Sequence, residues 1–184
     1  MTGKSLLLLR IQFLKRLLYL MDFKQISGHW IYCPTINSDS CIIDLGANKA
    51  EFSKQLFKNY NASCYAIEPN QDLLDEITDV NIHKFKYAIT KQNSLINFYI
   101  NNNHEASSVM ENFYSYSNNK RVDIVEGITW DSLIEKLELK YDIISIVKVD
   151  IEGSELDLIE SFTLSSVSFI DQLTIEFHDW LNVS

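Results

Sequence analysis

The 184-residue chain is 46% hydrophobic and 12% aromatic, with only five glycines and two prolines. This length and composition exclude a disordered or fibrous protein and indicate a globular domain with a substantial core. The net charge of −9 argues against general nucleic-acid binding, so we expect no nucleic-acid partner.

The first 24 residues are leucine-rich and basic, with five basic side chains against one acidic side chain. Basic residues interrupt the apolar run, so it resembles neither a transmembrane span nor a signal peptide. We expect a helix that packs on the domain or in a homo-oligomer interface, or else one whose residues 4–24 lie on an anionic membrane surface. We assign residues 1–39 to this basic helix and a linker, and residues 40–184 to the main domain.

The three cysteines, Cys33, Cys41 and Cys64, show no C-x-x-C spacing, and two of them begin apolar runs. This pattern is typical of buried, reduced thiols rather than of a disulfide framework or a zinc site. We therefore expect a cytoplasmic protein, with membrane association if the basic helix contacts a membrane surface.

From residue 40 onward, short apolar runs alternate with amphipathic segments. Residues 40–46 (SCIIDLG) predict a buried strand. Residues 50–60 (AEFSKQLFKNY) predict a helix, because large apolar side chains recur on one face. Asn48 and Glu51 have the spacing of a capping box, so we expect this helix to begin at Asn48.

The alternation continues toward the carboxyl end. Further strands are expected within residues 63–70, 82–90, 95–100, 122–128, 143–151 and 172–178, and further helices within residues 71–77, 130–139 and 154–162. Alternation at βαβ spacing predicts an α/β fold with a mostly parallel sheet covered by helices on both faces. Segment 101–120 is rich in Asn and Ser, and a loop of this length is expected to be a lid over a site or disordered.

The turn after the first predicted strand is the first indication of function. In an open α/β sheet, ligands bind beyond the carboxyl ends of the strands, beside the first strand. Gly46 allows the backbone to approach a ligand closely, and Asp44 can brace the turn or meet a positive group. A dinucleotide loop has two more glycines, at the positions of Asn48 and Glu51, and a glutamate there would repel a pyrophosphate. The expected ligand is therefore a nucleoside without a phosphate.

Glu68 ends the next strand, about twenty residues later, where a carboxylate can accept both hydroxyls of a ribose. An Asp-Gly turn alone is commonly structural, and a glutamate at a strand end is commonly only solvated. Together, the aspartate, the glycine and the later glutamate, without a phosphate cradle, fit S-adenosylmethionine as the cofactor.

Several motifs resemble those of the FkbM-type methyltransferase family over roughly residues 40–180: IIDLGANKAEFS, YAIEPN, GITWDSLIEK, VKVDIEGSELDLIES and LTIEFHD. The resemblance implies a class I methyltransferase fold, which is Rossmann-like, and S-adenosylmethionine as methyl donor. It also implies O-methyl transfer to a sugar, a polysaccharide or a secondary metabolite.

By matching positions, the resemblance gives a cofactor site that we extend to adjoining residues: Asp44, Gly46, Ala47, Asn48, Glu68, Pro69 and Ala88. Asp44, Gly46 and Asn48 would line the methionine end. Glu68 would bind the ribose, and Ala88 would lie near the adenine.

The chain departs from the family pattern at two places. The family usually has a glycine where this chain has Ala50, and the added methyl group is expected to narrow the turn or weaken cofactor binding. The chain also stops soon after EFHDW, where the fold normally adds a strand hairpin. We therefore expect the sheet to lack that hairpin, as in a short member, a fragment or a chain completed by a partner.

The block IVKVDIEGSE supplies candidate catalytic residues. Alternation along a strand places Lys148, Asp150 and Glu152 on one face. Burial of Lys148 would require a paired carboxylate, for which Asp150 and Glu176 are suited. Asp150 ends the strand beside the cofactor's strand, so we expect it to accept the proton of the substrate hydroxyl or to orient that hydroxyl.

The last predicted strand presents Glu176 and His178 on one face, and His178 has either a catalytic role as a base or a structural role. We assign Asp150, Glu152 and His178 as catalytic. These residues and Glu176 are also of the right types for a divalent metal, but no spacing rule singles one out, and we assign none. Three histidines form no recognisable constellation: His29, His83 and His104.

The sequence therefore predicts an S-adenosylmethionine-dependent O-methyltransferase with a small-molecule or glycan acceptor. Two alternatives stay open. A non-catalytic binding module of the same fold is favoured by Ala50 and the short carboxyl end. A nucleotide-dependent oxidoreductase of similar topology is disfavoured by the lack of G-x-G-x-x-G.

Overall fold

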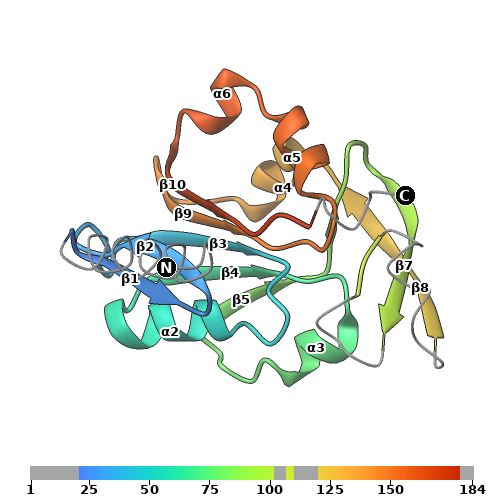
Figure 1. Ribbon diagram of the computed structural model, residues 1–184, viewed down its shortest axis with the longest axis horizontal. Helices are drawn as coiled ribbons and strands as arrows, with labels where there is room; N and C mark the ends of the chain where they lie inside the picture. The colour runs from blue at the N-terminus through green and yellow to red at the C-terminus, as the bar shows by residue number, and fades with distance from the viewer. Residues whose placement is uncertain (1–20, 102–106, 110–119, 179–184) are drawn as a thin grey trace, which may run out of the picture.

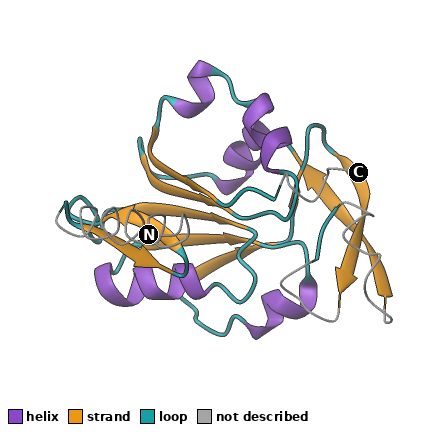
Figure 2. Cartoon of the chain, in the orientation of Figure 1, coloured by secondary structure: helices purple, strands orange, loops and turns teal. Residues whose placement is uncertain are grey.

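The fold is seen in a computed structural model that describes residues 21–101, 107–109 and 120–178 (Figure 1). Strands form the centre of the molecule, and the helices lie around them (Figure 2). The predicted basic helix, and most of the segment expected to contact a membrane, lie outside the described residues. None of the described helices is long and apolar enough to cross a membrane.

The larger sheet consists of five parallel strands in the order β10 (Ile170–Ile175), β9 (Ile144–Val149), β3 (Cys41–Leu45), β4 (Ser63–Ile67) and β5 (Ile82–Phe85). One face is covered by α2 (Glu51–Tyr60) and α3 (Gln71–Glu76). The other is covered by α4 (Trp130–Leu137), α5 (Glu155–Ser161) and α6 (Leu164–Val167), as Figure 1 shows. The α/β fold class predicted from the sequence is confirmed.

Two hydrophobic cores, one on each face, follow from the alternation of side chains along the central strand β3. Ile42 packs in the core that contains Phe52 of α2, whereas its neighbour Ile43 packs in the core that contains Trp130 of α4. All five residues of β3 are buried, as expected for a strand with neighbours on both sides and helices on both faces. The predicted burial of all three cysteines is also confirmed, and none forms a disulfide.

A second sheet stands beside the first, in the order β6 (Ala88–Ile89), β8 (Lys120–Ile128) and β7 (Ser94–Asn101). The strand β8 pairs antiparallel with β7 and parallel with β6. The single strand predicted over residues 82–90 is therefore wrong, because β5 and β6 belong to different sheets. The apolar pattern continues across the break, so periodicity alone did not reveal it.

The segment expected to be a linker contains a strand hairpin instead, formed by β1 (Phe23–Ile26) and β2 (His29–Tyr32). Ile26 and Ile31 belong to the core shared with α2. The backbone of Tyr32 exchanges two hydrogen bonds with the side chain of Gln172 on β10, at 2.9 and 3.0 Å. The hairpin is therefore packed on the sheet, and the proposed division at residue 39 stays a prediction.

The start of α2 differs from the prediction. The helix begins at Glu51, its N-cap is Ala50, and the described side chains provide no cap hydrogen bond. Asn48 instead has a positive φ of 51°, and its N–H donates to Glu68. The capping-box prediction is wrong because the turn is held by the neighbouring strand end and not by the helix itself.

The order of strands fixes where a site can form. From β3 the chain runs through α2, β4 and α3 to β5, and after the second sheet it returns to β9 on the opposite side of β3. The connections that leave β3 and β9 therefore diverge and leave a crevice beyond the carboxyl ends of these two strands.

Candidate active site

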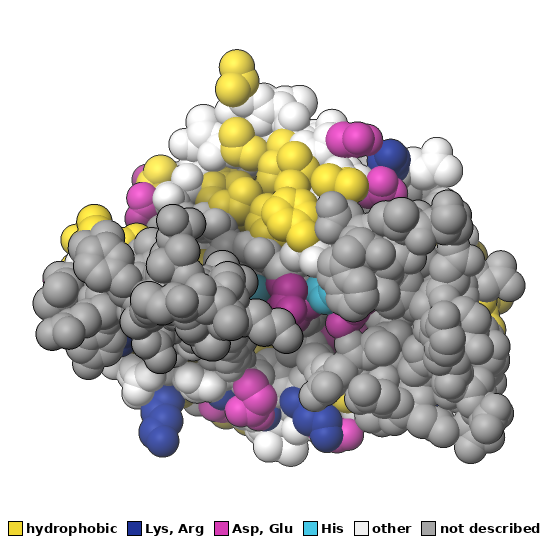
Figure 3. Space-filling model, in the orientation of Figure 1, with side chains coloured by type: hydrophobic (Ala, Val, Ile, Leu, Met, Phe, Trp, Pro, Cys, Tyr) yellow, Lys and Arg dark blue, Asp and Glu magenta, His cyan; other side chains and the backbone are white. Residues whose placement is uncertain are grey.

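A cavity of about 460 Å³ lies at this crevice, within the size range of small-ligand pockets. Its walls come from the ends of β3, β4, β9 and β10, from the second sheet, including Phe98, and from Ser107 in the connection between β7 and β8. Figure 3 shows acidic and histidine side chains gathered at the centre of one face of the molecule. Gly46 and Glu68 line the same cavity, as the proposed cofactor site requires.

Most of the predicted site residues line this cavity: Gly46, Asn48, Glu68, Pro69, Ala88, Asp150, Glu152 and His178. Two predicted residues do not line it. Asp44 is fully buried behind it, and Ala47 packs in the core shared with α2. Position at the cavity does not test a role in binding or catalysis, so the assigned roles stay predictions.

Gly46 is required by the packing of two loops. Its φ is 70°, and a Cβ at this position would collide with the backbone carbonyl of Asp150. The carbonyl of Leu45 accepts the N–H of Asp150 at 3.1 Å, which holds the ends of β3 and β9 together. We expected Gly46 to allow the backbone to approach a ligand closely. In this structure, it allows the backbone to approach the loop after β9 instead.

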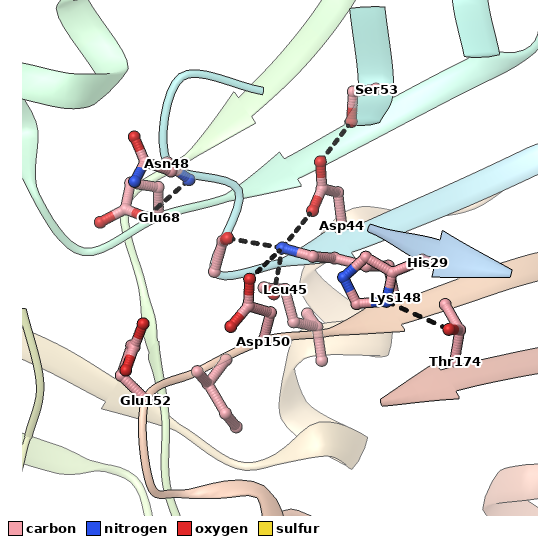
Figure 4. A network of polar contacts seen from close by, with 12 residues as sticks. His29, Asp44, Leu45, Asn48, Ser53, Glu68, Lys148, Asp150, Glu152 and Thr174 are labelled. Carbon is pink, nitrogen blue, oxygen red and sulfur yellow. Dashed lines mark hydrogen bonds and ion pairs between the residues drawn. The ribbon is translucent and has the colours of Figure 1, made fainter. Parts of the chain in front are cut away.

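Glu68 holds the turn after β3 to the end of β4. One of its carboxylate oxygens accepts the N–H of Asn48 at 2.9 Å (Figure 4). The other accepts the N–H of Asn70, also at 2.9 Å. Burial raises the pKa of Glu68 to about 7, although these two hydrogen bonds favour the ionised form. Each oxygen retains a lone pair, and Glu68 lines the cavity, so the carboxylate can also accept hydroxyl groups of a ligand.

Lys148 lies at the centre of a buried ion-pair network between β3 and β9 (Figure 4). Its Nζ lies 3.2 Å from Oδ1 of Asp44 and 3.4 Å from Oδ2 of Asp150, and it donates to the carbonyl of Gly46 at 2.8 Å. Burial on its own lowers the pKa of Lys148, but the two carboxylates outweigh it, and the pKa is raised. The expected partner Asp150 is confirmed, whereas Asp44 takes the place proposed for Glu176.

Asp44 therefore has a structural position. Its second oxygen accepts the hydroxyl of Ser53, on α2, at 2.8 Å. It thus connects β3 to α2 on one side and to Lys148 on the other.

The loop after β9 is organised by Glu155, the first residue of α5, which is 1% exposed. Its carboxylate accepts the N–H groups of Ile151 and Gly153 at 3.1–3.3 Å. Oε1 also lies 2.9 Å from Nδ1 of His178. The loop that carries Asp150 and Glu152 is therefore fixed relative to His178 by one buried carboxylate.

His178 faces two further carboxylates with its other ring nitrogen. Nε2 lies 3.6 Å from Oε2 of Glu152 and 3.9 Å from Oδ1 of Asp150. Burial on its own lowers the pKa of His178, but Glu155, Glu152 and Asp150 outweigh it, and the pKa is raised. Burial likewise raises the pKa of Glu152 to about 7, with His178 opposing that shift. These groups can hold or exchange a proton near neutral pH.

Sequence reasoning missed the place of His29. Its Nδ1 lies 3.1 Å from the hydroxyl of Thr174 on β10, and the ring lies beside Lys148 and Asp150 (Figure 4). Burial, and then Lys148, lower the pKa of His29. Because His29 lies more than a hundred residues before its partners, no spacing in the sequence signals the contact.

The wall opposite the strand ends was also missed, apart from Ala88 and the part of the predicted lid segment at residues 107–109. Tyr87, Phe98, Ser107 and Val109 line the cavity there. Ser108 belongs to the segment predicted as a lid, and its hydroxyl donates to the carbonyl of Glu152 at 2.6 Å. The other residues of that segment, except 101, 107, 109 and 120, lie outside the described residues, so the lid stays a prediction.

The comparisons with known proteins agree with the fold. Residues 44–182 match the family model of the methyltransferase FkbM domain, and the chain therefore belongs to this methyltransferase family. It is 26% identical over 148 residues to hexuronic acid methyltransferase AglP of Haloferax volcanii. The aligned region covers 76% of this chain and 56% of that protein. The chain thus spans about half the length of this curated relative. No solved structure matches the chain.

Proposed function

We propose that this protein transfers a methyl group from S-adenosylmethionine to a hydroxyl of a sugar. Membership of the FkbM family supports methyl transfer. The curated relative is by its name a hexuronic acid methyltransferase, which supports a sugar acceptor. The observation that carries the proposal is a single cavity with Glu68 at the end of β4 and an acid–histidine cluster at the ends of β9 and β10.

The cavity fits the adenosyl part of this cofactor at its Glu68 side. The carboxylate of Glu68 can accept two ribose hydroxyls with the lone pairs that the backbone leaves available. Ala88, Ile89 and Phe98 provide an apolar wall for a base. Asn48 is placed where the phosphate-binding glycine of a dinucleotide loop would stand, which disfavours a nucleotide-dependent oxidoreductase.

The other side of the cavity is suited to an acceptor hydroxyl. S-adenosylmethionine, when bound, supplies a methyl group on a positively charged sulfur. His178 is oriented by Glu155 through Nδ1, so Nε2 is directed to Glu152 and Asp150. A hydroxyl placed among these groups could give its proton to Asp150 or to His178, while the methyl carbon would exchange its bond to sulfur for a bond to that oxygen. Lys148 fixes the rotamer of Asp150 by an ion pair.

Cofactor binding is tested by calorimetric titration of the full chain with S-adenosylmethionine and with its demethylated product. We expect Glu68→Ala to weaken binding by about 1–3 kcal/mol, because two hydroxyls lose a charged acceptor. Glu135→Gln, at an exposed position on α4, serves as the control and should leave the dissociation constant unchanged. An unchanged constant in Glu68→Ala would remove Glu68 from the cofactor site.

Catalysis is tested with a disaccharide that contains a hexuronic acid, by following methyl transfer from labelled cofactor. Asp150→Asn should lower kcat much more than it weakens cofactor binding, because the proposed role is toward the acceptor proton. An equal loss of both would make Asp150 a cofactor-binding or folding residue. Absence of heat with both cofactor forms would favour the non-catalytic binding module.

A further inference from the structure

Three side chains with ligand chemistry meet at the acceptor side of the cavity. The donor atoms of Asp150, Glu152 and His178 all lie within 4.8 Å of one another, and all three residues line the cavity. Nε2 of His178 is 3.6 Å from Glu152 and 3.9 Å from Asp150, which is too long for hydrogen bonds. Ligands that share one cation through bonds of ~2.0–2.3 Å have separations of about 3–4 Å.

The orientation of His178 is a second observation that points to a cation. The residue is 8% exposed, and its Nδ1 is hydrogen-bonded to the buried carboxylate of Glu155 at 2.9 Å. The two carboxylates that face Nε2 favour a positive charge there, and a cation could displace the second ring proton, leaving the ring with its proton on Nδ1. Among the described residues, none forms a hydrogen bond with Nε2, which has only these two longer contacts with carboxylates. Histidines that bind metals usually donate their other N–H to a carboxylate in this way.

The charge around the cluster is unbalanced. Within the described chain, five carboxylates surround this side of the cavity: Asp44, Asp150, Glu152, Glu155 and Glu176. The cationic groups that contact them are Lys148 and, when protonated, His178, and Lys148 is paired with Asp44 and Asp150. A divalent cation between Glu152, Asp150 and His178 would offset this excess of negative charge.

We propose that Asp150, Glu152 and His178 bind a divalent cation, with Glu155 holding the imidazole in the ligating orientation. Carboxylates suit Mn²⁺, and an imidazole is a common ligand of first-row divalent metals, so Mn²⁺ is a suitable ion with which to probe this mixed set. The remaining coordination positions face the cavity, where they could take two neighbouring hydroxyls of a sugar and favour transfer of a proton from one of them to the carboxylate oxygen of Asp150 that the ion does not bind. That last role rests on the proposed function, whereas binding of the cation does not.

A neighbouring group offers an alternative position for the ion. The donor atoms of His29, Asp150 and Glu176 also lie within 4.8 Å of one another. One nitrogen of His29 is already engaged with Thr174, and His29 is not among the residues that line the cavity. Because Asp150 belongs to both groups, Glu152 and Glu176 are the residues that distinguish them.

The test is titration of the metal-free full chain with Mn²⁺, followed by calorimetry and by electron paramagnetic resonance. We expect saturable binding of one ion and electron–nuclear coupling to an imidazole nitrogen. Glu152→Gln and His178→Gln should each weaken binding at least ~10-fold, and the nitrogen coupling should vanish in His178→Gln. Glu135→Gln and Glu176→Gln should bind as the wild type does. Urea unfolding of each variant shows whether it is folded. Of the two ligands that are replaced, Glu152 is more exposed than His178, so its substitution is the less coupled to folding.

Three results would overturn the assignment. The first is the absence of saturable Mn²⁺ binding by the wild-type chain, and the second is binding that Glu152→Gln leaves intact. The third is loss of binding in Glu176→Gln alone, which would place the ion beside His29. Titration of the same protein with S-adenosylmethionine separates this inference from the proposed function. Cofactor binding without Mn²⁺ binding would contradict only the proposed cation site. Mn²⁺ binding without cofactor binding would contradict only the proposed methyltransferase function.

Discussion

Gly46 shows how one residue can determine the geometry of the whole cavity. The carbonyl of Asp150 occupies the space that a Cβ at Gly46 would need, whereas Gly28 has nothing within 4 Å of its Cβ position. Both glycines have positive φ, 70° and 88°, so alanine is strained at either one. The two positions therefore separate the cost of the backbone conformation from the cost of the collision.

Gly46→Ala should lower the free energy of unfolding by ~1–3 kcal/mol more than Gly28→Ala does, because only the first must displace the loop after β9. The measurement is urea denaturation of both variants beside the wild type. The displaced loop carries Asp150, so Gly46→Ala should also weaken binding at the cavity. Equal destabilisation of the two variants would contradict the loop-packing explanation of Gly46.

Glu68 should make stability depend on pH in a defined direction. The pKa of Glu68 is about 7 in the folded protein, whereas the ordinary pKa of a glutamate is 4.5, so between these values the folded state retains a proton that the unfolded state has released. The contribution of Glu68 to the free energy of unfolding is therefore fully present at low pH, and it is lost as the pH rises from about 4.5 to about 7. The loss is on the order of 3 kcal/mol.

Glu68→Gln tests this prediction because a glutamine cannot titrate. The variant should be less stable at low pH, since its amide nitrogen must face one of the backbone N–H groups that Glu68 now binds. Its stability relative to the wild type should improve steadily between about pH 4.5 and pH 7. The measurement is chemical denaturation at several pH values, and parallel curves for the two proteins would show that Glu68 does not titrate as proposed.

At the scale of elements, Lys148 holds β3 and β9 together at the end that forms the site. It pairs with Asp44 on one strand and with Asp150 just after the other, and its side chain is 6% exposed. Removing one partner of a buried pair leaves an uncompensated charge, which costs far more than the pair contributes.

Lys148→Met should therefore lower the free energy of unfolding by ~3–5 kcal/mol, because Asp44 stays buried without its counter-charge. The double variant Asp44→Asn, Lys148→Met should recover part of that loss, since no buried charge then lacks a partner at this point. Urea denaturation of the single and double variants provides the comparison. If the free energy of unfolding falls in the double variant by the sum of its falls in the two single variants, Asp44 and Lys148 are not coupled.

At the scale of the whole molecule, the β1–β2 hairpin provides a test of the domain boundary predicted at residue 39. Ile31 on β2 is 1% exposed and packs in the core shared with α2, although the sequence assigned it to a linker. Ile31→Ala should lower the free energy of unfolding by ~2–5 kcal/mol, as for other buried isoleucines. Ile124→Ala, at a position 70% exposed on β8, should change it by no more than about 0.5 kcal/mol.

The measurement is again denaturation, with intrinsic fluorescence reporting on the core. A cooperative single transition for Ile31→Ala at a lower urea concentration would show that the hairpin and the sheet unfold together. An effect of Ile31→Ala as small as that of Ile124→Ala would restore the boundary at residue 39.

By itself, the sequence determined the parallel sheet, the order of its strands and helices along the chain, and eight of the residues that line the cavity. It could do so because burial on both faces makes β3, β4 and β9 apolar, and because Gly46, Glu68 and Asp150 each follow directly after a strand.

Only the tertiary structure decided which groups meet across those strands. The pairs Lys148 with Asp44, His178 with Glu155 and His29 with Thr174 join positions that are 23 to 145 residues apart. The start of α2 was likewise decided by a contact with Glu68, and the hairpin by its packing on β10. Local pattern records which face of an element is buried, but it contains no information on which distant polar group will lie opposite, because that depends on strand order and register.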